Sequence, residues 1–169
     1  MKASARPCVR RREFLASLAA GSAGLLLPRR GWADQPAAEL LAGEGVVDTT
    51  PPLGIELGGF HRAPGNERRV QGIRQPTAAR ALMLKLGDTE AAILSVDIAT
   101  VSDEFTRRVQ DRLASQTGIP AKNVRVCATH THSMPALNYL RQWGAIPVDY
   151  MNDLEAKCAE AVALARQDL

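Results

Sequence analysis

The sequence predicts an α/β fold with a mixed sheet, in which a β-hairpin is followed by a right-handed β-α-β unit and helices pack on the sheet. Two apolar segments, 78–86 and 91–98, are separated by a Gly-Asp turn typical of a hairpin. An amphipathic segment, 102–117, then leads to a third apolar run, 124–130. Such crossovers between parallel strands are right-handed in nearly all proteins. Because the last helical pattern reaches the end of the chain with no Gly or Pro after it, we expect an incomplete domain.

One further strand is expected before the hairpin, over 43–49, after a polar lead-in over 34–41. The Pro-Pro pair that begins at Pro51 ends this strand, because proline lacks the N–H that a sheet ladder needs. The segment 58–75 is irregular and rich in glycine and arginine, and long irregular segments inside a domain are commonly functional. His61 lies in this segment and is a candidate site residue; a solvated loop histidine is the alternative.

Asp97 interrupts the otherwise apolar strand 91–98 near its carboxyl end. A carboxylate on a buried strand needs a hydrogen-bond donor, a cationic partner or a metal ion, because burying an unpaired charge is costly. Two interpretations follow. Asp97 either caps the turn that comes after the strand or contributes to a metal site close to the histidines described below.

Two amphipathic helices are expected. The first begins after Ser102, a typical N-cap residue, and ends near Gly118. The second runs from about 148 to 166. Both carry apolar side chains at helical spacing, which indicates core packing. These apolar positions are Phe105, Val109 and Leu113 in the first helix, and Met151, Leu154, Cys158, Val162 and Ala165 in the second.

Two of the chain's three histidines, His130 and His132, stand at the end of the last predicted strand, 124–130. Residues i and i+2 of a strand point to the same face, so the two imidazoles are expected side by side. Open α/β sheets bind ligands at the carboxyl ends of their strands, and imidazole is both a common metal ligand and a proton carrier. The pattern favours metal binding or acid–base catalysis. Solvated histidines that only bond the backbone are the alternative.

The first 33 residues have the pattern of an export signal. Segment 11–15 reads R-R-E-F-L, which matches the twin-arginine pattern, and a short apolar run and a small-residue site ending at Ala33 follow. The apolar run is shorter than the about 20 residues that a membrane span needs. We therefore expect export by the twin-arginine machinery to the periplasm or the medium, with no transmembrane helix in the mature chain. An uncleaved N-terminal anchor is the alternative.

Composition excludes a nucleic-acid-binding role. The formal charge is +3, but residues 1–33 carry seven basic side chains and one acid, which leaves the remainder at −3. A mildly acidic domain has no electrostatic basis for binding nucleic acid. Cys127 and Cys158 belong to no paired framework, and we expect both to be small buried hydrophobes. A disulfide between them is the alternative.

Three segments carry a resemblance to a known family. They are V-D-T-T-P-P-L-G at 47–54, A-R-A-L at 79–82 with its turn and Asp97, and 118–135, which contains G-I-P-x-x-N-V and T-H-T-H-S-x-P. Together they resemble the N-terminal part of the neutral/alkaline (non-lysosomal) ceramidase family. The resemblance implies that residues 34–169 are the N-terminal portion of a ceramidase-like α/β domain.

Members of this family are zinc-dependent amidohydrolases that cleave the amide of ceramide, a linear amide, with zinc activating a water molecule. The resemblance implies an exported enzyme of this kind, with Zn²⁺ as cofactor and a ceramide-like lipid amide as substrate. It implies that the pair His130 and His132 supplies a zinc ligand, so both are candidate catalytic and metal-binding residues. Either ring can be the ligand, and the other can hydrogen-bond as an outer partner. Asp97 and His61 are further candidate ligands because of their positions in the sequence. A non-catalytic, ceramidase-like binding protein is the alternative function.

Two positions depart from the family pattern. The family usually reads G-I-H where this chain has Gly72-Ile73-Arg74. The resemblance makes that histidine a second zinc ligand, and a guanidinium, which stays protonated, cannot replace it as a metal ligand. The usual S-G-P is Ser133-Met134-Pro135. The resemblance places the family's remaining zinc ligands, a glutamate and a tyrosine, outside this sequence. We therefore expect the chain to contain only part of an active site.

Overall fold

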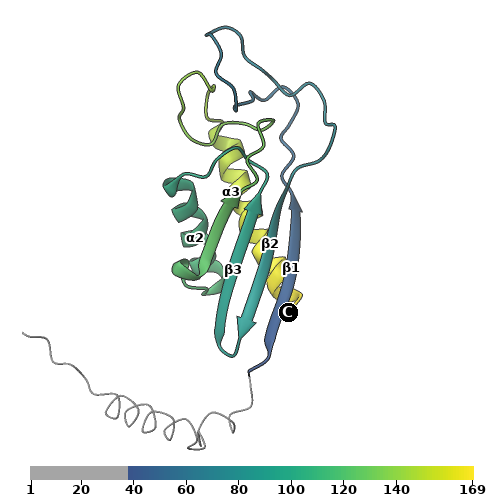
Figure 1. Cartoon of the computed structure of the whole chain (residues 1–169), viewed down its shortest axis with the longest axis vertical. Helices are drawn as coiled ribbons and strands as arrows, with labels where there is room; N and C mark the ends of the chain where they lie inside the picture. Colours follow the sequence, from purple (N-terminus) through teal and green to yellow (C-terminus); the bar gives the residue numbers. More distant parts are fainter. Residues whose placement is uncertain (1–37) are drawn as a thin grey trace, which may run out of the picture. The chain divides into compact units, whose positions relative to one another are not determined.

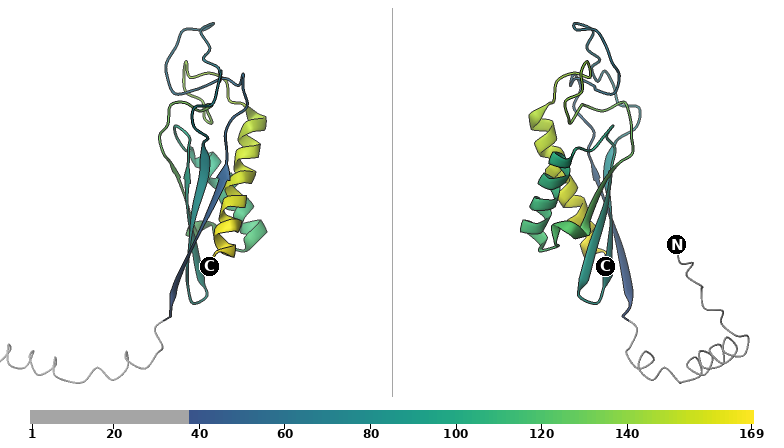
Figure 2. Two further views of the ribbon diagram at one scale, coloured as in Figure 1. Left: turned by 90° about the vertical axis from the view of Figure 1, so that its right-hand side faces the viewer. Right: turned by 60° about the vertical axis from the view of Figure 1, so that its left-hand side comes forward.

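The computed structural model describes residues 38–169, so the predicted signal peptide over 1–33 lies outside the described residues. The described chain forms one four-stranded mixed sheet with both long helices on the same face (Figures 1 and 2). This arrangement confirms the predicted α/β class. The strands are β1 (Leu40–Asp48), β2 (Ala78–Leu86), β3 (Thr89–Val96) and β4 (Val124–Ala128); the helices are α2 (Asp103–Thr117), α3 (Val148–Gln167) and the short 3₁₀ helix η1 (Ala121–Asn123).

The strand order is β1-β2-β3-β4, with antiparallel pairing except between β3 and β4, which are parallel. The hairpin of β2 and β3 closes through a two-residue turn, because Leu86 pairs directly with Thr89. Helix α2 then connects β3 to β4, as predicted. As a result β1, β3 and β4 all terminate at the same end of the sheet, where the loops 49–77 and 129–147 gather (Figure 1).

Five predicted strand boundaries were wrong. β1 ends at Asp48, and β3 ends at Val96, so Asp97 follows the strand that it was expected to interrupt. β1 begins at Leu40, so the last two residues of the expected polar lead-in belong to the sheet. β3 begins at Thr89, because the tight turn needs only two residues. β4 ends at Ala128, two residues before its predicted end, since His130 has a φ of 64° and leaves the extended conformation. Both site histidines therefore lie on the loop that follows β4.

Helix α2 follows the sequence prediction closely. The Ser102 hydroxyl accepts a hydrogen bond of 3.1 Å from the Phe105 N–H, so it caps the helix as expected. Phe105, Val109 and Leu113 are all buried. The predicted apolar stripe is thus part of the core between the helices and the sheet.

Helix α3 approaches β1 very closely because β1 carries Gly43 and Gly45 at the positions that face the helix. A Cβ atom on Gly45 would lie 2.1 Å from the Ala161 carbonyl oxygen. The Tyr150 hydroxyl of α3 is buried and donates a hydrogen bond of 2.6 Å to the Thr49 carbonyl oxygen just after β1. These contacts hold the C-terminal helix against the edge strand and complete the core.

Both cysteines of residues 38–169 are free thiols, so the alternative of a disulfide between them is not what the structure shows. Cys158 is fully buried in α3, and burial, with a smaller contribution from nearby Glu155, raises its pKa to about 12. Cys127 is partly exposed on β4, so the expectation that it is buried was wrong. Within residues 38–169, neither helix combines the length and apolar character that crossing a membrane requires.

Candidate functional site

The structure brings His130 and His132 together on the loop after β4. Their Nε2 atoms are 3.3 Å apart and their rings meet edge to face, with centroids 4.8 Å apart. The sequence suggested that strand alternation would place the two rings side by side, but both residues lie outside the strand. The left-handed backbone of His130 turns the chain instead. A non-glycine residue in this conformation is strained, and such strain is often found at functional sites.

The ring of His130 has a defined orientation. Its Nδ1 lies 2.7 Å from the carbonyl oxygen of Ala99. A carbonyl oxygen only accepts hydrogen bonds, so the proton of a neutral imidazole is assigned to Nδ1. The Nε2 of His130 then accepts a hydrogen bond of 3.3 Å from the Nε2–H of His132, and a metal ion bound by both nitrogens would replace that proton. Metal-binding histidines commonly use one ring nitrogen for such a backbone contact and the other for the metal. His130 is also exposed, which leaves Nε2 accessible.

The glycine-rich loop packs directly on His132. The Phe60 ring meets the His132 ring at 5.1 Å, and Arg68 lies 4.7 Å above the Phe60 ring. Gly59 has a φ of 93°, and a Cβ atom there would lie 2.9 Å from the backbone of His132. The position therefore requires glycine both for its conformation and for this close contact. The expectation that the irregular segment 58–75 contributes to a site is consistent with this packing.

Trp143 lies between His61 and the histidine pair and contacts both His61 and His132. The Trp143 ring contacts His61 at 6.1 Å and His132 at 5.7 Å between centroids. Residues 38–169 contain no group of three or more His, Cys, Asp or Glu side chains placed to hold a metal ion. The two candidate ligands of lower rank, His61 and Asp97, are therefore not gathered with the histidine pair in the described part of the chain.

Asp97 is held by three donors from neighbouring segments. One carboxylate oxygen accepts from the Ala78 N–H and from Arg80, both at 2.9 Å, and the other accepts from the Thr129 hydroxyl at 3.1 Å. Burial raises the pKa of Asp97, but these hydrogen bonds lower it by more, so the pKa lies below its ordinary value of 3.8. Asp97 thus ties the start of β2 to the loop that carries the histidines.

Replacing Asp97 by asparagine is expected to lower the free energy of unfolding by about 1–2 kcal/mol at pH 7, because Arg80 loses its anionic partner. A carboxylate with a lowered pKa stabilises the protein above its unfolded-state pKa, and this contribution is lost as the pH falls through the folded-state value. The difference between the two proteins should therefore shrink below pH 3.8. Urea titrations at pH 7 and pH 3 measure it; an unchanged difference at both pH values would contradict this role.

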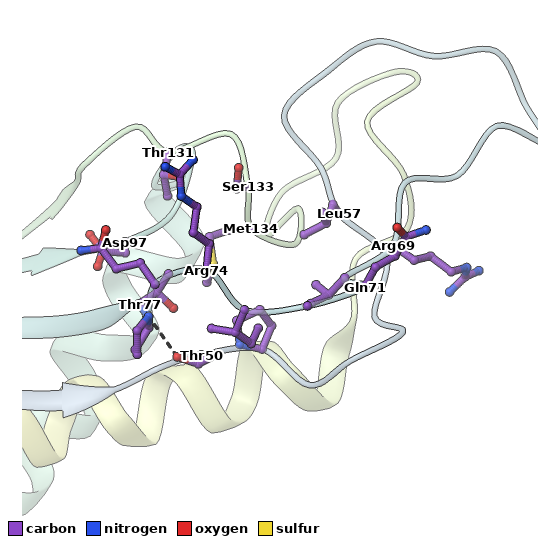
Figure 3. Close-up of a pocket in the computed structure, with 16 residues that line it drawn as sticks. Thr50, Leu57, Arg69, Gln71, Arg74, Thr77, Asp97, Thr131, Ser133 and Met134 are labelled. Carbon is purple, nitrogen blue, oxygen red and sulfur yellow. Dashed lines mark hydrogen bonds between the residues drawn. The ribbon is translucent and has the colours of Figure 1, made fainter.

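A cavity of about 520 Å³ opens beside the histidine loop (Figure 3). Thr131 and Ser133 line it, whereas His130 and His132 do not. The segment 69–77 forms most of the opposite wall, and the Arg74 side chain extends toward Thr131. Sequence reasoning missed this cavity, because no local pattern shows that the segment before β2 folds against the loop after β4.

The histidine pair fits two corners of a zinc site. Two nitrogens bound to zinc at 2.0–2.1 Å with a tetrahedral angle lie about 3.3 to 3.4 Å apart. The two Nε2 atoms are 3.3 Å apart, and neither is taken up by a backbone group. The donors are imidazole nitrogens, which zinc readily accepts. The described residues therefore supply two suitable ligands at suitable spacing.

No family model matches the sequence, and no curated protein matches it either. Among solved structures, the chain is similar to neutral ceramidase from Pseudomonas aeruginosa, with a TM-score of 0.64, 20% identity and 79% of this chain covered. A ceramidase complexed with C2 is similar with the same TM-score and identity over 78% of this chain. This chain spans 22% of the length of each. The described residues therefore have a neutral ceramidase-like fold.

Proposed function

We propose that this chain contributes the histidine pair of a zinc-dependent amidohydrolase that cleaves N-acyl lipid amides such as ceramide. The observation that carries the proposal is the 3.3 Å separation of the two Nε2 atoms, with the His130 ring fixed by Ala99. The ceramidase-like fold supports the substrate class, since the two similar structures are ceramidases. This chain spans 22% of the length of each, so the activity of the whole protein is part of the proposal.

The two histidines have different supports in this site. His130 Nδ1–H donates to the Ala99 carbonyl oxygen, which presents Nε2 to a metal ion. His132 is held by Phe60 and by the close backbone of Gly59. When bound, zinc would activate water and polarise the amide carbonyl. A catalytic zinc has about three protein ligands, so the proposal requires a ligand besides those gathered in residues 38–169.

The proposal includes export. The twin-arginine pattern at 11–15 directs folded proteins across the cytoplasmic membrane, and a site that acquires its metal during folding suits this route. We infer that the protein acts in the periplasm or outside the cell, where it would meet lipid amides. The export machinery would then be its first partner.

The test is release of fatty acid from an N-acyl sphingosine dispersed in detergent. The full chain is stripped of metal, reloaded with one equivalent of Zn²⁺, and compared with its His130→Ala variant and with the metal-free protein. Because a catalytic zinc needs a ligand besides this pair, the assay is also run with the chain joined to a segment that supplies a third ligand. We expect zinc binding that requires His130, and fatty-acid release that requires zinc, His130 and that third ligand. If the three-ligand protein holds zinc and releases no fatty acid, the amidohydrolase proposal is wrong.

A non-catalytic binding protein with the same fold is the second candidate. The observation in its favour is Arg74, a cationic side chain beside the histidine loop at a place where the resembling family has a histidine. This candidate predicts that zinc-loaded protein binds the lipid amide and leaves it intact. The same incubation, analysed for bound and cleaved lipid, distinguishes the two.

A further inference from the structure

We propose that the cavity beside the histidine loop binds an amphiphilic carboxylate, such as a fatty acid, with Arg74 as the residue that holds the carboxylate group. The size of the cavity is the first argument. Its volume of about 520 Å³ falls within the range of about 300–1,000 Å³ that is usual for small-molecule sites. It lies at the end of the sheet where β1, β3 and β4 terminate.

The walls of the cavity suit a hydrocarbon chain. Val70 and Met134 are buried with 7% and 1% of their surfaces exposed, whereas Ile73 is 45% exposed at the same cavity. An apolar chain seated here would cover the exposed part of Ile73, and removing that apolar surface from water is favourable. The apolar side chains that line the cavity are Pro51, Leu57, Val70, Ile73, Pro76 and Met134.

The charge of the cavity favours an anion. Arg74 takes part in none of the ion pairs of residues 38–169. Asp97 is the one acid among the residues that line the cavity, and its charge is already matched by Arg80 at 2.9 Å. Arg69 donates to the Gly54 carbonyl oxygen, and Figure 3 shows it extending away from Arg74. Arg69 also takes part in none of these ion pairs, but it points away, so Arg74 is the guanidinium placed to meet an anionic ligand.

A carboxylate matches this guanidinium better than a phosphate does. The planar fork of arginine binds a carboxylate through two parallel hydrogen bonds. Thr131 and Ser133 line the same cavity and add hydroxyl donors. A phosphate monoester would carry nearly two negative charges against one arginine placed to meet it. A single carboxylate with an apolar tail uses all of these groups.

This site is separate from the proposed zinc ligands, because His130 and His132 do not line the cavity. Binding of the carboxylate should therefore not require metal. Failure of carboxylate binding would not contradict the proposed hydrolase function, and failure of hydrolysis would not contradict carboxylate binding.

Isothermal titration of the full chain with octanoate, below its micelle concentration and with a chelator present, tests the proposal. We expect one saturable site. Arg74→Gln should weaken binding by about tenfold or more, since it removes a charged hydrogen-bonding partner, and Arg74→Lys should weaken it less. The matched control is Arg125→Gln, an exposed arginine of β4 outside this cavity, which should leave binding unchanged. 1-Octanol, which has the tail alone, should bind more weakly than octanoate.

The proposal is overturned if octanoate shows no saturable binding, if Arg74→Gln binds as tightly as the parent, or if Arg125→Gln loses as much affinity. Equal binding of 1-octanol would show that the carboxylate is not recognised. Tighter binding of octyl phosphate would show that the site prefers a doubly charged anion. Circular dichroism of each variant confirms that the comparison is between folded proteins.

Discussion

The Gly45→Ala variant is expected to lose about 3 kcal/mol or more of its free energy of unfolding. The added Cβ would lie 2.1 Å from the Ala161 carbonyl oxygen and 2.6 Å from the Ala165 backbone nitrogen. Both atoms belong to the backbone of α3, so no side-chain rotation relieves the overlap. Overpacking of a core costs about 1–3 kcal/mol even where side chains can adjust, and the helix must here move away from β1.

Gly72→Ala is the matched control for this prediction. A Cβ at Gly72 meets no atom within 4 Å, and the residue lies in the loop before β2. Its stability should stay within about 0.5 kcal/mol of the parent, as for most surface substitutions. Urea unfolding followed by circular dichroism measures both variants. A Gly45→Ala protein as stable as Gly72→Ala would show that α3 does not pack on β1 in this way.

The His130→Ala variant is expected to bind zinc about 100-fold more weakly than the parent. It removes one of two ligands, whereas loss of an outer hydrogen-bonding partner alone typically costs about 10–100-fold. His132→Ala should have an effect of similar size, because both Nε2 atoms are needed at their 3.3 Å spacing. Competition against a chromophoric zinc chelator measures the affinities.

His61→Ala provides the matched control, since it also removes one imidazole. His61 contacts Trp143 and is not gathered with the pair. Its removal should leave zinc affinity close to that of the parent. If His61→Ala weakens zinc as much as His130→Ala does, His61 is a ligand and the assignment of the site must change.

Local patterns predicted the parts of the fold that local forces determine. The Gly87–Asp88 turn between two apolar runs predicted the hairpin of β2 and β3. Ser102 and the apolar stripe of α2 predicted a capped helix and the crossover to β4. In these elements each residue's own preference agrees with the final structure, which is why one sequence was enough.

The errors arose where contacts between distant segments decide the conformation. Gly43 and Gly45 looked like ordinary strand residues, but they are required because α3, more than a hundred residues later, packs on them. The histidines were expected on a strand, yet His130 adopts a φ of 64° within a loop that contacts Ala99 and Gly59. Hydrophobic periodicity contains no information about such contacts.

The structure brings together the two histidines that the sequence selected, but their surroundings could not be predicted. The H-x-H spacing was enough to select His130 and His132. Phe60 and Trp143, which contact His132, have no signal of their own in the sequence. The cavity around Arg74 likewise depends on how two loops far apart in the chain meet at the end of the sheet.

We propose that the Nε2 atoms of His130 and His132 together bind one zinc ion. Nitrogen-15 NMR of the imidazoles during titration of the metal-free full chain with Zn²⁺ tests it most directly. We expect both Nε2 resonances to shift together and to saturate at one equivalent of zinc, while His130 keeps its proton on Nδ1. Zinc binding that leaves both Nε2 resonances unchanged, or the absence of binding by folded protein, would contradict it.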